Sequence, residues 1–353
     1  MPDSATSITT STTAAARQPA GWAPLAAAMR HRLAWPLVTL GLLLAVNTAF
    51  NANFLHLEWR DGHLYGSLVD ILNRAAPTML LALGMTLVIA TGGVDLSVGA
   101  VMAIAGAVAA MLLAKPGMNV GLVVAASLGV ASLAGLWNGV LVGFFQVPPI
   151  VATLILMVSG RGIAQLITGG QIITFENRAF EFLGRGVLFG LPITVTLVGA
   201  VSVLLVLLTT RTAAGLFIEA TGDNETASRY AGVNTRAVKL LAYAVCGLCA
   251  GLAGLIVTAD IKAADANNAG LYLELDAILA VVIGGTSLTG GRLALAGSLV
   301  GAALIQALTT TILTRGIPPT FTLVVKSAVI VGVCLLQAPK FRAVVAQCIP
   351  RRS

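Results

Sequence analysis

The octapeptide GGVDLSVG, residues 92–99, places a carboxylate and a hydroxyl between two long apolar runs. Twenty uncharged residues, 75–94, precede Asp95 and nineteen, 96–114, follow it, which is about one membrane crossing each. A bilayer tolerates a broken helix only where it faces protein or a water-filled path, so Asp95 and Ser97 are candidates for the lining of such a path. The alternative is a tight turn at the membrane surface, in which Asp95 caps the next helix. Both interpretations require a polytopic membrane protein.

A second glycine-rich octapeptide, GGTSLTGG at residues 284–291, repeats the Gly-Gly, Leu and Gly positions of the first. Only seven residues separate it from Asp276, about 10 Å of helix, which allows this break to lie at membrane depth. Broken helices at equivalent places in two halves are typical of a transporter's substrate path, although glycine-rich octapeptides also resemble one another by chance. The polar residues within apolar runs that we expect to line such a path are Asp95, Ser97, Asn138, Arg161, Gln165 and Ser287.

The composition excludes a soluble protein. Only 10% of residues are charged, against about 25% in a soluble domain, and 57% are hydrophobic. The 38 glycines suit close helix packing in lipid, because small residues let backbones approach. The net charge of +7 comes from basic residues that flank apolar runs, which is a membrane orientation signal and not evidence for nucleic acid as a partner.

Motifs for covalent, metal or nucleotide chemistry are missing from the sequence. Cys246 and Cys249 have CxxC spacing, but they lie inside an apolar run, where two small side chains are ordinary packing. The sequence has no GxxxxGK[ST], GxSxG or HExxH motif. We therefore expect no enzyme activity, no metal and no cofactor in this chain, and any ATP hydrolysis must come from another subunit.

The apolar runs predict an all-α polytopic fold of about ten crossings with broken glycine-rich segments. Twelve Lys and Arg residues fall on the inner side and seven on the outer side if the N-terminus is inside, so we expect both termini in the cytoplasm. Residues 1–32 are expected to be a disordered tail, 33–339 the membrane domain and 340–353 a basic tail. The expected crossings are 33–57, 75–94, 96–114, two within 116–160 that flank Pro148-Pro149, 187–208, 240–259, 277–291, 293–314 and 316–339.

The hydrophilic segment 209–239 is too long for a turn and too short for a domain. It suits a short helix across the membrane surface, bounded by glycines and with arginines available to a partner, although a solvated loop is the alternative. Its residues that we expect to contact a partner or to transmit motion are Glu219, Gly222, Asn224, Arg229, Gly232 and Asn234.

Three stretches carry a resemblance to a known family. They are FIEATGDNETASRYAGVNTR, TMLLALGMTLVIATGGVDLSVGAVMAIAGA and ADIKAADANNAGLYLELDAILAVVIGGTSLTGGR. Together they resemble the permease subunits of bacterial ABC sugar importers of the ribose type, over about residues 35–340, and ADANNAG is most similar to the galactofuranose branch. Ser228 stands where the family often has a second alanine, and the segment after Gly291 is less glycine-rich.

The resemblance implies a permease domain in the bacterial inner membrane, surrounded by lipid. It implies three partners: a cytoplasmic ATP-binding subunit docked on residues 209–239, a second permease that is identical or different, and a periplasmic sugar-binding protein. It also implies alternating access for galactofuranose or a related monosaccharide. The rival hypotheses are an ion-coupled secondary sugar transporter, which needs coordinating groups at the midplane, and an assembly protein without a pathway.

Overall fold

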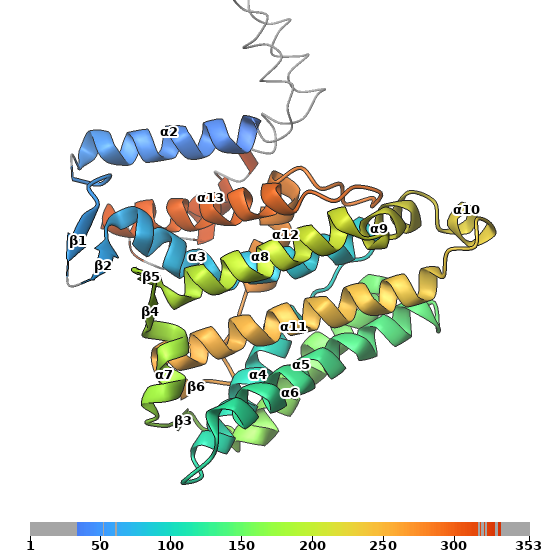
Figure 1. The fold of residues 1–353 in the computed structure, drawn as a ribbon, viewed down its shortest axis with the longest axis horizontal. Helices are drawn as coiled ribbons and strands as arrows, with labels where there is room; N and C mark the ends of the chain where they lie inside the picture. Colours follow the sequence, from blue (N-terminus) through green and yellow to red (C-terminus); the bar gives the residue numbers. More distant parts are fainter. Residues whose placement is uncertain are drawn as a thin grey trace, which may run out of the picture.

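The computed structural model describes residues 34–51, 53–60, 62–316, 318, 321, 323–328 and 331–332. The two predicted tails, 1–32 and 340–353, lie outside these residues, as does most of the predicted tenth crossing. The described chain is mainly helical, with three pairs of short strands at one end of the helical bundle (Figure 1). The predicted fold class, a helical membrane protein, is therefore confirmed.

The helices of the first half are α2 (Ala34–Phe50), α3 (Ser67–Ala90), α4 (Val98–Leu113), α5 (Val120–Gly143), α6 (Pro149–Thr168) and α7 (Arg178–Arg185). Those of the second half are α8 (Ile193–Arg211), α9 (Ala214–Asp223), α10 (Glu225–Tyr230), α11 (Thr235–Ile261), α12 (Leu273–Ile283) and α13 (Leu295–Thr314). The antiparallel strand pairs are β1 (Glu58–Arg60) with β2 (His63–Tyr65), β3 (Ile173–Thr174) with β6 (Ala263–Ala264), and β4 (Val187–Leu188) with β5 (Leu191–Pro192).

Six of the described helices are long and apolar enough to cross a membrane: α3, α5, α6, α8, α11 and α13. Helices α2 and α4 are apolar but shorter, and α12 has only 11 residues. The predicted number of about ten crossings is therefore not confirmed. The predicted breaks themselves are confirmed, because α3 ends before Gly92, α4 begins after Ser97, and α6 begins at Pro149.

The core lies around α3, α4 and α11. The most apolar stretch of α3 is 78% buried and that of α11 is 67% buried, whereas that of α8 is only 17% buried. The corresponding stretches of α5 and α6 are only 22% and 28% buried. Such exposed apolar surface is stable only against lipid or another protein, so these three helices form the outer side of the bundle.

Glycine permits the close contact between α5 and α11. A Cβ on Gly135 would overlap the carbonyl oxygen of Tyr243 and would lie 3.0 Å from the Gly247 Cα. Four residues later, a Cβ on Gly139 would lie 2.8 Å from the Leu240 Cα. These spacings place the glycines on one face of α5, as in other membrane helices that pack through small residues.

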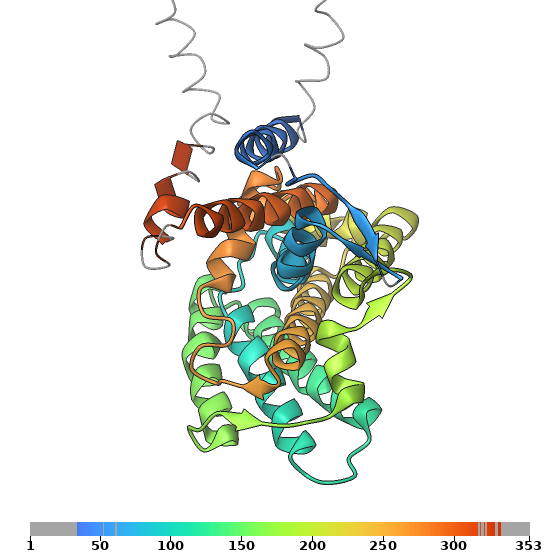
Figure 2. The ribbon, with the colours of Figure 1, turned by 90° about the vertical axis from the view of Figure 1, so that its left-hand side faces the viewer.

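The two ends of the bundle differ. Helix α7 and the strand pairs gather at one end, which we call the hairpin end, and α9 and α10 protrude at the other (Figure 1). Seen from the hairpin end, α2 lies outside the main bundle (Figure 2), where it packs on α13. The α9–α10 end contains the segment that the sequence predicts to meet a partner.

Candidate functional site

Three of the six predicted lining residues meet in one buried cluster beyond the end of α3. The Asp95 Oδ1 accepts hydrogen bonds from the Ser97 backbone N–H at 2.9 Å and from the Ser97 hydroxyl at 2.6 Å. From α5, the Asn138 amide donates to Ser97 Oγ at 2.9 Å and to Asp95 Oδ1 at 3.4 Å. None of the three is more than 1% exposed. In this conformation the cluster is closed to solvent, and it joins the segment between α3 and α4 to α5.

Asp95 is not the cap of α4, because Ser97 occupies the N-cap position. The carboxylate instead accepts the N–H of the residue two positions on, which is the geometry of an Asx turn. Asp95 thus orders the backbone that leads into α4, from a position that is buried in the protein.

The N-termini of the short helices α4 and α12 meet inside the bundle. A Cβ on Gly270, just before α12, would lie 2.6 Å from the Gly99 carbonyl oxygen in the first turn of α4. Glu274 in the first turn of α12 is 7% exposed, and its Oε2 has no hydrogen-bond partner among the described residues. Helix N-termini favour a carboxylate, so this meeting point offsets part of the cost of burying Glu274.

Glu274 was not among the predicted lining residues, because it lies between the expected crossings 240–259 and 277–291. The available signal was a carboxylate at the start of an apolar run, preceded by Gly270. Its burial depends on the contact with α4, which is distant in sequence.

Arg161 and Gln165, one turn apart on α6, hold the segment that leads into α12. The Arg161 guanidinium donates to the carbonyl oxygens of Ala266 at 3.1 Å and Ala269 at 2.6 Å. The exposed Gln165 amide donates to Asn267 Oδ1 at 2.6 Å. Arg161 also attracts the carboxylate of Glu274 electrostatically. These two predicted residues therefore form a second polar group, associated with residues 265–274.

An ion pair connects α12 to the last apolar run. The Lys326 Nζ lies 2.5 Å from the Asp276 Oδ2, and both side chains are largely buried. Lys326 belongs to the described helical residues 323–328. Any displacement of α12 along its axis would therefore act on this run as well as on the meeting point with α4.

Ser287, the sixth predicted residue, lies apart from both groups, in the turn of residues 284–293 that we call the α12–α13 turn. Its hydroxyl is 2.7 Å from that of Thr289. The same turn contacts α3 through a hydrogen bond from the Gly291 N–H to the Ala90 carbonyl at 3.0 Å. It also contacts α9, since the Leu293 N–H donates to Glu219 Oε1 at 2.9 Å. Both glycine-rich breaks pack against α9, and the depth of this break in the membrane stays a prediction.

Gly222 lies inside α9 and does not bound a helix, which corrects the prediction of one short helix flanked by glycines. A Cβ at Gly222 would overlap the Ala90 carbonyl oxygen and would lie 2.5 Å from the Gly291 nitrogen. The role of this glycine is close backbone approach and not flexibility. Gly232, by contrast, has a φ of +87° and follows α10 in open space.

The segment after α9 forms a second helix, α10, which begins because the Asn224 side chain accepts the Ala227 N–H at 2.9 Å. The Glu225 carboxylate binds Arg229 at 2.5 Å and the Lys239 Nζ at 2.6 Å. Partial burial opposes ionisation of Glu225, but the hydrogen bonds and charges of Lys239 and Arg229 outweigh it and lower the pKa of this carboxyl below 4.5. Arg229 is therefore engaged within the loop.

Asn234 and Glu219 also have internal roles. The Asn234 side chain caps α11 by accepting the Ala237 N–H at 3.1 Å. The Glu219 carboxylate accepts the Leu293 N–H, as described above. Beside exposed charged residues such as Arg211, Asp223 and Arg236, three large apolar or aromatic side chains also face outward: Leu216 is 68% exposed, Phe217 39% and Tyr230 90%. Sequence reasoning selected the polar residues of this loop and missed these three, although an aromatic side chain in a hydrophilic segment was a visible signal.

Comparison with known proteins agrees with this architecture. Residues 67–334 match the family model described as the permease component of the branched-chain amino acid transport system. The chain is 54% identical over 317 residues to the galactofuranose transporter permease protein YtfT of Escherichia coli K12, covering 88% of this chain and 93% of that protein.

Two further relatives cover similar lengths. The fructose import permease protein FruF of Bifidobacterium longum is 41% identical, over 88% of this chain and 89% of its own. The ribose import permease protein RbsC of E. coli K12 is 35% identical, over 86% of this chain and 93% of its own. No solved structure gives a significant match. The matched length and these identities show that the chain belongs to the family of transport-system permease components.

Proposed function

We propose that this chain is the membrane-spanning permease of an ATP-driven sugar importer, and that its substrate is galactofuranose or a related monosaccharide. The observation that carries the proposal is the 54% identity to a galactofuranose permease along nearly the whole of both chains. The contacts of α9 with both glycine-rich breaks support it, because a permease driven by a separate ATPase needs a cytoplasmic element connected to its interior.

The route from the cytoplasmic side to the interior follows from the contacts. Helix α9 holds the α12–α13 turn through Glu219 and through the backbone at Gly222. This turn continues directly into α12, whose 11 residues span about 16 Å. At its far end α12 carries Glu274 and Asp276. A push on α9 therefore reaches the meeting point with α4 and the ion pair with Lys326 through one rigid helix.

The pathway in this proposal runs along α6. The polar group of Arg161, Gln165 and Glu274 forms its entrance, because Gln165 and part of Arg161 are accessible. The cluster of Asp95, Ser97 and Asn138 forms a closed layer nearer to α9. Carboxylate, guanidinium and amide groups suit sugar hydroxyls, which donate and accept hydrogen bonds. Opening of the closed layer is the step that ATP binding or hydrolysis would drive.

The proposed topology is ten crossings in the bacterial inner membrane, with both termini and α9–α10 in the cytoplasm. The excess of basic residues on that side supports this orientation. The proposed partners are an ATP-binding subunit, a second permease and a periplasmic sugar-binding protein. The ATP-binding subunit docks on Leu216, Phe217 and Tyr230, because exposed apolar side chains on a cytoplasmic loop indicate a protein contact.

Co-purification tests the proposal. The tagged chain is extracted in mild detergent from membranes of its own cells, and the associated proteins are identified by mass spectrometry. We expect an ATP-binding subunit and a permease partner, and we expect Tyr230→Asp to remove the ATP-binding subunit. Tyr65→Asp, which changes an exposed tyrosine at the hairpin end, is the matched control and should leave the complex intact. A chain that purifies alone and accumulates sugar with an ion gradient would contradict the proposal.

A further inference from the structure

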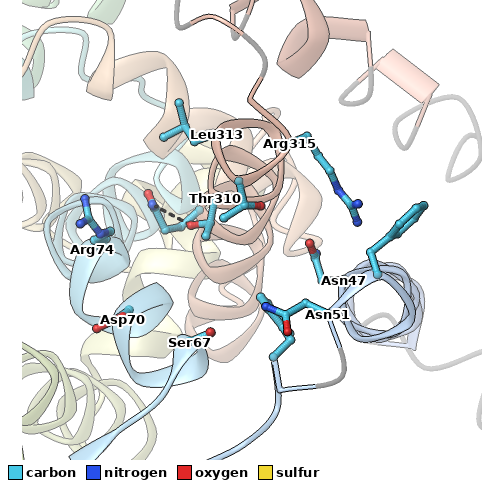
Figure 3. A pocket seen from close by; sticks show the side chains of 12 residues that line it. Asn47, Asn51, Ser67, Asp70, Arg74, Thr310, Leu313 and Arg315 are labelled. Carbon is cyan, nitrogen blue, oxygen red and sulfur yellow. Dashed lines mark hydrogen bonds between the residues drawn. The ribbon is translucent and has the colours of Figure 1, made fainter.

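A cavity of about 450 Å³ lies at the hairpin end, between the C-terminal ends of α2 and α13 and the N-terminal end of α3 (Figure 3). None of the residues of the proposed pathway lines it. Asn51 and Arg315 lie on one side of the end of α13, and Asp70 and Arg74 lie on the other (Figure 3). Charged side chains at the rim of an apolar bundle require either water or a ligand.

These charges have no hydrogen-bond or ion-pair partner within the described residues. Asp70 and Arg74 are one turn apart on α3, yet no hydrogen bond or ion pair joins their side chains. Arg315 stacks over the Phe50 ring, 3.5 Å from its centroid, which leaves its N–H groups free to donate in the plane of the guanidinium. The Asn51 Oδ1 accepts the Asn53 N–H at 3.1 Å, so the amide nitrogen of Asn51 remains a donor.

An apolar groove of about 180 Å³ runs along the same contact between α2 and α13. Leu43 and Val46 line it from α2, and Leu304 and Leu308 line it from α13. On α2 these positions share a helix face with Phe50, and on α13 they share one with Arg315. The groove spans about 10 Å from Thr39 to Val46, and Asn47, the next residue, lines the cavity.

We propose that the cavity and the groove together bind one glycerophospholipid. Its phosphate accepts hydrogen bonds from Arg315 and Asn51, the polar end of its headgroup extends toward Asp70, and one acyl chain lies in the groove. Along α2 and α13, the polar and charged residues lie at the hairpin end and the apolar groove lies farther from it. This sequence of polar and apolar surface matches that of an amphiphile. A sugar or a free anion has no acyl chain that could occupy the groove. Because Asp70 is an acceptor, headgroups that end in N–H or O–H donors are preferred. This site is independent of the proposed import function.

The test uses the full chain in nanodiscs of phosphatidylcholine that contain small equal amounts of phosphatidylethanolamine and phosphatidylglycerol. Lipids that remain bound after transfer to detergent are counted by native mass spectrometry. We expect the wild type to retain one lipid, with ethanolamine or glycerol headgroups enriched about tenfold over choline, which has no terminal donor. Arg315→Gln and Val46→Trp should each lower retention about tenfold. Lys115→Gln removes an exposed charge elsewhere at the same end and should have no effect. Asp70→Asn should remove the headgroup preference and leave retention intact.

Three results would overturn the proposal. The first is equal retention by the wild type and Arg315→Gln. The second is equal competition by soluble glycerophosphoethanolamine and by the intact lipid, because the groove would then contribute nothing. The third is unchanged lipid retention by Val46→Trp together with loss of a co-purifying protein from Arg315→Gln, which would make the cavity a protein interface.

Discussion

Gly222→Ala is the substitution that should separate ATP hydrolysis from transport. The new Cβ would overlap the Ala90 carbonyl oxygen and would lie 2.5 Å from the Gly291 nitrogen, closer than real Cβ atoms approach. Both neighbours are backbone atoms, so neither can rotate away. Helix α9 must therefore move off the α12–α13 turn by about 1 Å, which lengthens the 2.9 Å hydrogen bond from Leu293 to Glu219 beyond hydrogen-bonding distance.

The expected magnitude follows from these two effects. Overpacking of this kind costs about 1–3 kcal/mol, and a hydrogen bond to a carboxylate contributes about 1.5–3 kcal/mol when buried and less here, where it is partly exposed. If the contact between α9 and the α12–α13 turn is weakened by about 1.4 kcal/mol, the population of molecules in which the two are in contact falls about tenfold. The outward side chains Leu216, Phe217 and Tyr230 are unaffected, so docking of the ATP-binding subunit should persist.

The assay is sugar uptake per ATP hydrolysed in proteoliposomes that contain the purified complex. Gly222→Ala should keep the subunits together and lower this ratio about tenfold. Gly199→Ala is the matched control, because a Cβ there meets nothing within 4 Å, and it should behave as the wild type. A Gly222→Ala complex that is intact and transports at the wild-type ratio would refute the coupling route through the α12–α13 turn.

Three further predictions concern stability. Asp95→Ala leaves the N–H and O–H of Ser97 without their acceptor in a buried site, so it should destabilise the protein by about 1–3 kcal/mol and lower its Tm in detergent, whereas Asp95→Asn should retain most of the stability. Gly135→Ala, which overlaps α11, should lower the Tm, and Gly129→Ala, in open space, should not. Because the pKa of Glu225 is lowered in the fold, its stabilisation is complete above pH 4.5 and is lost as the pH falls through the lower folded value; hydrogen exchange of residues 225–239 should increase over that range, and Glu225→Gln should remove the pH dependence.

The sequence was sufficient to predict the main helices and the breaks between them, because local residue chemistry determines both. Long apolar runs predicted the main helices, and the Gly92-Gly93 and Pro148-Pro149 pairs predicted where the chain breaks, because glycine and proline disfavour helix. The cluster of Asp95, Ser97 and Asn138 was only partly predictable. Polarity within apolar runs selected its members, but their contact depends on how α5 packs on the segment before α4.

Features that depend on packing between distant segments were not predictable. Gly222 was expected to bound a short helix, yet its neighbours Ala90 and Gly291 require close approach. Glu219 was expected to contact a partner or to transmit motion, but its acceptance of the Leu293 N–H could not be predicted. Glu274 was not selected, because its burial against Gly99 is a contact between residues far apart in the chain.

The central claim is that this chain imports sugar with energy from a separate ATPase. The most direct measurement is galactofuranose accumulation in proteoliposomes that contain the chain with its ATP-binding subunit and permease partner, with the sugar-binding protein outside and ATP inside. We expect accumulation that requires hydrolysable ATP, stops when the ATP-binding subunit is omitted, and is unaffected by collapse of ion gradients. Accumulation by the chain alone, driven by a proton or sodium gradient without ATP, would contradict it.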